Sequence, residues 1–284
     1  MKKRAVTLGL IQSTPVSDFN DNLARSAALV EKAAKKGAQI ICLPELYRSP
    51  YFPQKDKLDA ARFAEPIPGE STQAFSRIAK RHGVVIAVPL FEKAGARFYN
   101  SVAVLDADGK LLDTYRKIHI PHDPLFYEKS YFEPGDRGFK VFKTRFGNFS
   151  VLICYDQWFP EAARSCKLAG AELLFYPTAI GYIKGYRAPE GDWREAWMTI
   201  QRGHAIANSI HVAPVNRVGG EGELRFWGTS FVADAFGNVV KQGSLSKEEI
   251  VIAKVDLSTN ASVGEGWGFM RNRRPEAYAA LVKR

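Results

Sequence analysis

The stretch Phe149-Ser-Val-Leu-Ile-Cys-Tyr-Asp-Gln-Trp-Phe-Pro-Glu161 joins an apolar run to a polar turn and then to a helix start at Pro160. An apolar run that leads through a turn into a helix is typical of a buried strand in a layered α/β domain. Cys154 lies where this strand ends, next to a helix N-terminus whose backbone NH groups can stabilise negative charge. Free cysteines are more often inert core residues, so the hypothesis of a nucleophile depends on partners elsewhere in the chain.

Strand and helix patterns alternate on both sides of this stretch, which indicates an α/β fold. Amphipathic spacing predicts helices over residues 20–36, 71–82, 160–169 and 192–208, with Ser71 as the N-cap of the second helix. Apolar runs predict strands over residues 6–11, 39–43, 84–91, 102–106, 110–115, 139–144, 149–153, 172–176, 211–215, 229–234, 238–242 and 249–255. Since no repeat or linker divides the pattern, we expect residues 1–284 to form a single domain.

The composition and the lengths of the apolar runs limit the classes of protein to which the chain can belong. A chain of 284 residues with 46% hydrophobic residues can form one large core, and three cysteines without paired spacing predict free thiols in a reducing compartment. The first apolar run breaks at Gln12, too early for a signal peptide, and no run reaches the ~18 apolar residues of a membrane span. We therefore expect a cytoplasmic protein that does not bind membranes.

The formal net charge of +10 is spread along the chain among acidic residues. The one dense cluster, residues 271–274, is not accompanied by any pattern of a nucleic-acid-binding motif. For this cluster we favour contacts between subunits over nucleic acid as a partner.

Three ionisable residues share one kind of position, directly after a predicted strand: Glu45, Lys117 and Cys154. The strand ends of α/β domains are where functional sites are commonly built. A carboxylate can accept the proton of a thiol, and an ammonium can stabilise both a thiolate and an oxyanion, so the three form a complete set for acyl transfer. Each one alone is more typical of a solvated surface charge.

The residues that surround Glu45, Lys117 and Cys154 in the sequence point to one family. They resemble, in the family's order, the three signature blocks of the nitrilase (carbon-nitrogen hydrolase) superfamily: Leu43-Pro-Glu-Leu46, Tyr115-Arg-Lys-Ile-His119 and Ile153-Cys-Tyr-Asp-Gln-Trp-Phe-Pro-Glu161. The resemblance extends from the first strand to Asn272-Arg-Arg-Pro275 near the C-terminus.

The resemblance implies an αββα sandwich of two mixed sheets flanked by helices. By position, it makes Glu45 the general base, Lys117 the oxyanion stabiliser and Cys154 the nucleophile of a cysteine-dependent amidohydrolase. It matches Glu128 to a second glutamate that orients the lysine and the substrate nitrogen; on spacing alone, a loop salt bridge with Lys129 remains open. No metal or organic cofactor is implied. A homodimer or higher homo-oligomer is implied, with the tail of about residues 257–284 docking on a partner subunit.

Within the superfamily, residues 154–161 and Phe175-Tyr-Pro-Thr-Ala-Ile-Gly181 are most similar to the polyamine branch that hydrolyses N-carbamoylputrescine. We expect this substrate to be lined by a set of five residues: Tyr51, Tyr155, Trp158, Thr178 and Glu190. The chain departs from the branch at Tyr182-Ile183, where a Ser-Glu pair usually supplies a carboxylate for the distal ammonium. An N-carbamoyl-β-alanine or other N-carbamoyl amino acid amidohydrolase, an ω-amidase and an inactive scaffold of the same fold remain as alternatives.

Overall fold

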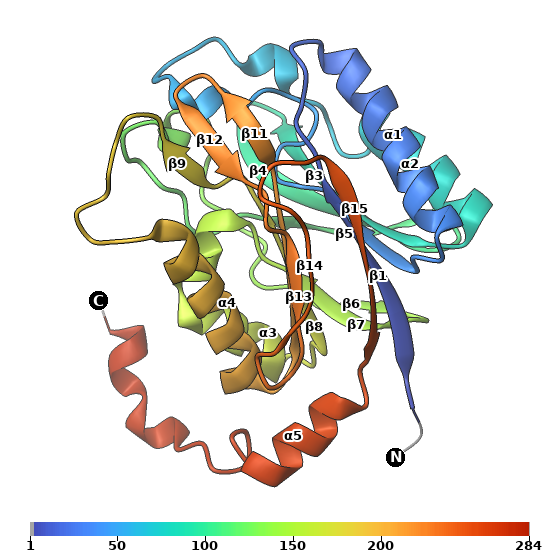
Figure 1. The fold of residues 1–284 in the computed structure, drawn as a ribbon, viewed down its shortest axis with the longest axis vertical. Helices are drawn as coiled ribbons and strands as arrows, with labels where there is room; N and C mark the ends of the chain where they lie inside the picture. Colours follow the sequence, from blue (N-terminus) through green and yellow to red (C-terminus); the bar gives the residue numbers. More distant parts are fainter. Residues whose placement is uncertain (1–2, 284) are drawn as a thin grey trace.

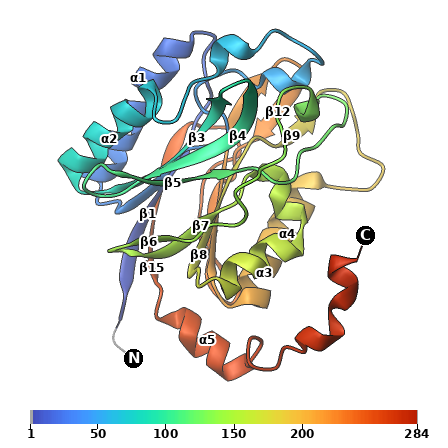
Figure 2. The same ribbon diagram turned by 180° about the vertical axis from the view of Figure 1, so that it is seen from behind.

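The apolar runs form the strands of two six-stranded mixed sheets, which pack face to face in a computed structural model that describes residues 3–283 (Figures 1 and 2). The first sheet has the order β15-β1-β2-β3-β4-β5 and the second β14-β13-β10-β8-β7-β6. The strands of the first sheet are β1 (Ala5–Gln12), β2 (Ile40–Cys42), β3 (Val85–Ala94), β4 (Arg97–Leu105), β5 (Leu111–Arg116) and β15 (Glu249–Asp256). Those of the second are β6 (Phe142–Thr144), β7 (Gly147–Val151), β8 (Leu173–Thr178), β10 (His211–Asn216), β13 (Phe231–Ala233) and β14 (Val239–Gln242).

Helices cover the outer face of each sheet, as amphipathic helices do when they bury one apolar stripe. The pair α1 (Phe19–Lys35) and α2 (Glu70–His82) packs on the first sheet, and α3 (Pro160–Leu168) and α4 (Trp193–Asn208) pack on the second. The layers are therefore helix, sheet, sheet, helix, which confirms the predicted αββα sandwich.

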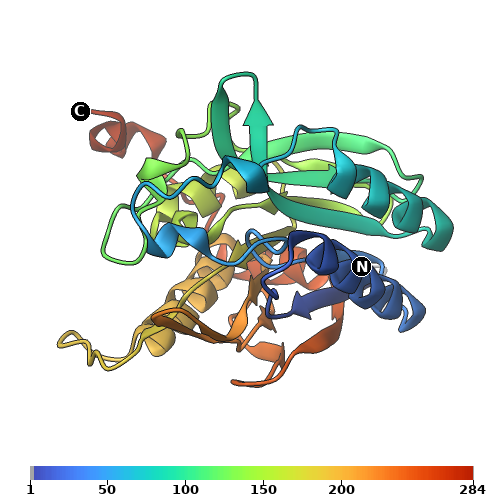
Figure 3. The ribbon, with the colours of Figure 1, turned by 90° about the horizontal axis from the view of Figure 1, so that it is seen from above.

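The first and last strands of the chain are neighbours, because β1 pairs antiparallel with β15 along its whole length, from Ala5 opposite Asp256 to Gln12 opposite Glu249. The chain then leaves the body of the molecule through α5 (Thr259–Trp267), and its C-terminal segment lies outside the layers (Figure 3). Residues 1, 2 and 284 of the expected domain lie outside the described residues. In the part of the chain that is described, no helix has the length and apolar character needed to cross a bilayer.

Two features of the fold differ from the sequence prediction. The prediction that Ser71 caps the second helix is wrong: α2 starts at Glu70 after Gly69, whose NH donates to Thr72 Oγ1 at 2.8 Å, while the Ser71 NH and hydroxyl both donate to Glu65. The prediction also missed a third, three-stranded sheet of order β11-β12-β9. Its strands β9 (Gly181–Ile183), β11 (Val218–Glu221) and β12 (Leu224–Trp227) have only three or four residues each, and β9 and β11 contain glycine, which weakens a strand pattern.

Candidate active site

Four chemically active side chains meet where strands of the two large sheets end. Glu45 follows β2, Lys117 follows β5, and Cys154 follows β7 as the first residue of a 3-10 turn (Cys154–Trp158). Glu128 begins a second 3-10 turn (Glu128–Ser130) in the long loop after β5. All four residues are buried, so their charges interact with little screening by water. The structure therefore brings together the four residues for which the sequence suggested catalytic roles.

Lys117 is the centre of the cluster. Its Nζ donates to Glu45 Oε1 at 2.8 Å and to Glu128 Oε2 at 2.6 Å, and all three side chains are fully buried. A loop salt bridge between Glu128 and Lys129, the open alternative for Glu128, is not formed, since the Glu128 carboxylate binds Lys117 instead. The ammonium thus contacts two carboxylates at one buried position.

Each carboxylate also has a neutral hydrogen-bond donor. Asn100 on β4 donates from Nδ2 to Glu45 Oε1 at 2.7 Å, and the Tyr51 hydroxyl donates to Glu128 Oε1 at 2.7 Å. The other oxygen of Glu45, Oε2, is buried and has no hydrogen-bond partner among residues 3–283. Buried carboxylate oxygens are rarely left without a partner, so Glu45 has one acceptor position available for a proton from the thiol, the substrate or water.

The pKa values of the cluster reflect burial and mutual charge. Burial raises the pKa of Cys154 well above its usual value, and the Glu45 charge raises it further while Lys117 lowers it. Burial alone would lower the pKa of Lys117, but Glu128 and Glu45 raise it above its usual value, so the ammonium stays charged. Burial raises the pKa of Glu128 to about 7 against the opposing effect of Lys117. The resting sulfur is therefore a thiol that needs a base, and the Glu45 carboxylate is close enough to raise the pKa of that thiol.

The turn that carries Cys154 is held by a residue whose role the sequence did not reveal. Cys154 has a φ of +42°, a left-handed conformation that costs free energy for a residue with a side chain. Buried Asp156 stabilises it by accepting from the Ile153 NH at 2.9 Å, the Tyr115 hydroxyl at 2.7 Å and the His119 NH at 3.0 Å. Asp156 thereby connects the turn of the thiol to the end of β5, where Lys117 lies.

The residues expected to line the substrate differ in burial and in whether they contact the four-residue cluster. Tyr51 belongs to the cluster through Glu128, and Tyr155 is half-buried directly after the thiol. Thr178 is fully buried, but its hydroxyl donates to the Tyr176 carbonyl of its own strand at 2.8 Å. Trp158 is exposed.

Glu190 lies on the exposed loop of residues 184–192 that extends from the body in Figure 3, where it accepts from Trp193 Nε1 at 2.6 Å. Within the described residues, no hydrogen bond links Thr178, Trp158 or Glu190 to the four-residue cluster.

The carboxylates and the thiol of this site are not arranged as the ligands of a metal ion. Among residues 3–283, no three or more His, Cys, Asp or Glu side chains are arranged to hold a metal ion. The positive charge in the cluster belongs to the Lys117 ammonium.

Comparison with known proteins places this geometry in a family. A model of the family described as carbon-nitrogen hydrolase matches residues 7–265. An N-carbamoylputrescine amidase from Solanum lycopersicum is 43% identical over 293 residues, which cover 99% of this chain and 96% of that protein. A citrullinase from Francisella tularensis is 38% identical over 94% of this chain and 96% of that protein. The crystal structure of a carbon-nitrogen hydrolase from Helicobacter pylori G27 is similar with a TM-score of 0.93 and 38% identity, covering 99% of both chains.

Proposed function

This chain belongs to the carbon-nitrogen hydrolase family, and we propose that it hydrolyses N-carbamoylputrescine to putrescine, carbon dioxide and ammonia. Membership makes it a hydrolase of non-peptide carbon-nitrogen bonds in linear, small-molecule amides. The observation that carries the proposal is the buried cluster in which Lys117 bridges Glu45 and Glu128 beside the Cys154 thiol. The relative at 43% identity supports the choice of substrate.

The proposed reaction begins when the Cys154 sulfur attacks the carbamoyl carbon and its proton moves to Glu45. The carbonyl oxygen becomes an oxyanion, which Lys117 and the Tyr155 backbone NH stabilise by charge and hydrogen bonding. The carbon-nitrogen bond breaks, and the leaving ammonia takes the proton back from Glu45. Glu128 holds Lys117 in place through the contact of 2.6 Å.

The second half restores the enzyme. Glu45 takes a proton from water as the water oxygen attacks the S-carbamoyl carbon, and the carbon-sulfur bond breaks. The proton passes from Glu45 to the departing sulfur, which returns as the Cys154 thiol. The released carbamate divides into carbon dioxide and putrescine, so one water is consumed for each substrate.

A second candidate substrate is a ureido amino acid such as citrulline. Its tail carries both an ammonium and a carboxylate, whereas the tail of N-carbamoylputrescine carries only an ammonium. The relative described as a citrullinase, 38% identical, supports this alternative.

The test is a measurement of ammonia release from N-carbamoylputrescine, citrulline, N-carbamoyl-β-alanine and an ω-amide, with Cys154→Ala as the matched control. The proposal requires the highest kcat/KM on N-carbamoylputrescine and no release by the control. Preference for citrulline would replace the first candidate with the second. Release by Cys154→Ala would refute the mechanism on any substrate.

We also propose a cytoplasmic homodimer or larger homo-oligomer of a single-domain chain, with the tail docked on a partner subunit. The tail displays apolar side chains to solvent, with Trp267 57%, Leu281 65% and Val282 87% exposed. It faces α3 and α4 across a hollow of about 830 Å³. Apolar surface of this kind is typical of subunit contacts. Light scattering on a chain that lacks residues 269–284 tests this, because loss of the tail should lower the molecular mass to that of a smaller assembly.

A further inference from the structure

Arg217 is a fully buried arginine that binds the backbone of the segment bearing Glu45. It lies between β10 and β11, directly after the end of β10 in the second large sheet, whereas Glu45 follows β2 of the first. Its guanidinium donates to three carbonyl oxygens: Glu45 at 3.1 Å, Leu46 at 2.6 Å and Ser49 at 3.0 Å. These bonds link the two sheets at the residue proposed as the base.

Glu221 extends this contact to the far end of the same segment. One carboxylate oxygen pairs with Arg217 Nη1 at 2.8 Å, and the other accepts from the Tyr51 NH at 2.7 Å. The Tyr51 hydroxyl in turn binds Glu128. The Arg217–Glu221 pair therefore contacts residues 45–51 at both ends: at the backbone of Glu45 and at the backbone of Tyr51, whose hydroxyl binds Glu128.

The segment needs such support because its backbone is strained. Leu46, the residue after the base, has a φ of +50°, which is unfavourable for a residue with a side chain. The planar guanidinium can donate to several oxygens at fixed angles, which a lysine ammonium cannot reproduce. A buried charge with this many partners fixes a geometry rather than merely filling space.

We propose that Arg217, paired with Glu221, is a positioning residue that sets where the Glu45 carboxylate lies relative to Lys117 and Cys154. The inference rests on the proposed function of Glu45 as the base. Because the contacts go to the backbone, their loss moves the carboxylate without changing any group that touches the substrate. A displacement near 1 Å can reduce the rate of a catalysed step by about 100-fold.

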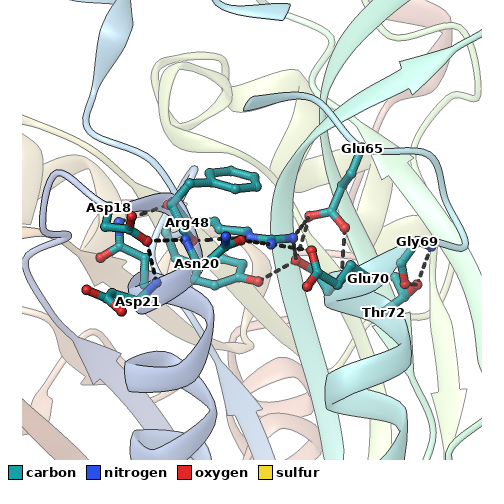
Figure 4. Close-up of polar contacts among 12 residues, drawn as sticks. Asp18, Asn20, Asp21, Arg48, Glu65, Gly69, Glu70 and Thr72 are labelled. Atoms are coloured by element: carbon teal, nitrogen blue, oxygen red, sulfur yellow. Dashed lines mark hydrogen bonds and ion pairs between the residues drawn. The ribbon is translucent and has the colours of Figure 1, made fainter. Parts of the chain in front are cut away.

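Arg48 provides a matched control on the same segment. It is also buried and ion-paired, but its side chain points toward the N-terminal ends of α1 and α2, where it contacts Asn20, Glu65 and Glu70 (Figure 4). Its side chain makes no hydrogen bond to the carbonyls of residues 45–47 within the described part of the chain. Arg48→Lys should therefore lower the free energy of unfolding while leaving kcat within about threefold of the wild type.

The kinetic test compares Arg217→Lys, Glu221→Gln and Arg48→Lys. Arg217→Lys should lower kcat by about 10- to 100-fold with KM changed less than twofold, and Glu221→Gln should lower kcat by a smaller factor. If Arg217→Lys lowers the free energy of unfolding but keeps kcat within threefold, Arg217 is only structural and the inference is overturned. The same conclusion follows if Arg217→Lys and Arg48→Lys lose kcat in proportion to their loss of stability.

A second readout needs no substrate: the pH dependence of alkylation of Cys154 by iodoacetamide, located by mass spectrometry. The groups that act on the thiol charge are Glu45, Lys117 and Glu128, and Glu45 raises its pKa. Glu45→Gln should therefore move the midpoint of alkylation to lower pH. Arg217→Lys should move it in the same direction by a smaller amount, because the carboxylate is displaced rather than removed, while Arg48→Lys leaves it unchanged.

The kinetic measurement and the alkylation measurement together distinguish a failure of the proposed role of Glu45 from a failure of the proposed role of Arg217. A midpoint that does not move in Glu45→Gln contradicts the proposed base itself, whatever Arg217 does. A midpoint that moves in Glu45→Gln but stays at the wild-type value in Arg217→Lys overturns the positioning inference alone.

Discussion

Replacing Lys117 with methionine tests whether the buried cluster is held by charge. Methionine keeps most of the volume of the side chain but removes the ammonium that contacts Glu45 at 2.8 Å and Glu128 at 2.6 Å. Two buried carboxylates are then left without their counter-ion. Removal of one partner of a buried pair costs about 3–5 kcal/mol of unfolding free energy, and we expect a loss in that range at pH 8.

The loss should shrink as the pH falls. Lys117 lowers the pKa of Glu128, so its removal raises that pKa above the present value of about 7. A carboxyl group whose pKa is higher in the folded than in the unfolded chain destabilises the fold at high pH, and this cost disappears as the pH falls toward the unfolded value of about 4.3. Glu128 of the wild type is itself protonated below its pKa of about 7, so this cost becomes the same in the two proteins there. The difference in stability between wild type and variant should therefore narrow as the pH falls from 8 to about 6 and stay constant from there to pH 5.

The assay is urea unfolding at pH 8, 7, 6 and 5 with protein concentration held constant, since assembly also stabilises the fold. Lys110→Met is the control, because Lys110 is 83% exposed and forms a surface pair with Asp108 at 3.1 Å. Surface pairs contribute little to stability, so the control should match the wild type at every pH. A loss for Lys117→Met that is equal at pH 8 and pH 5 would refute the electrostatic account, and would indicate a packing defect instead.

Three further substitutions test the site. Cys154→Ala should abolish turnover while the circular dichroism spectrum and the melting temperature stay at the wild-type values. Tyr51→Phe removes a buried hydrogen bond of 2.7 Å to the Glu128 carboxylate, which should cost about 1.5–3 kcal/mol of unfolding free energy. Because the Tyr51 hydrogen bond lowers the pKa of Glu128, the acidic limb of the pH profile of kcat should move to higher pH in this variant. An acidic limb at the wild-type pH would contradict a catalytic role for the ionised Glu128 carboxylate. Gly135→Ala places a Cβ 2.1 Å from the Arg116 carbonyl oxygen, so the end of β5 should be displaced. Thermal unfolding should show a loss of about 1–3 kcal/mol in stability, and ammonia release should show a lower kcat.

The layered architecture and the four cluster residues could be predicted because their signals are local. The alternation of apolar runs and amphipathic stretches depends only on neighbouring residues, and so does the match of short blocks around Glu45, Lys117 and Cys154 to a family. The helix start at Ser71 was mistaken because the serine donates to Glu65, a tertiary contact that no helix pattern contains.

The partners of the cluster could not be predicted from the sequence. Asn100 lies 55 residues from Glu45 and Arg217 lies 172 residues from it, yet both bind that residue. Neither position has a distinguishing pattern around it, because an asparagine in a strand and an arginine after one are common on solvated surfaces.

From the sequence alone follow the α/β layers, the family and the chemical groups of the site. Only the tertiary structure decided which oxygen of Glu45 lacks a hydrogen-bond partner among residues 3–283, which residues hold its backbone, and that Glu190 and Trp158 lie exposed. The physical reason is that apolar periodicity is a property of a continuous segment, whereas the partner of a buried polar atom depends on which distant strands the packing of two sheets brings together.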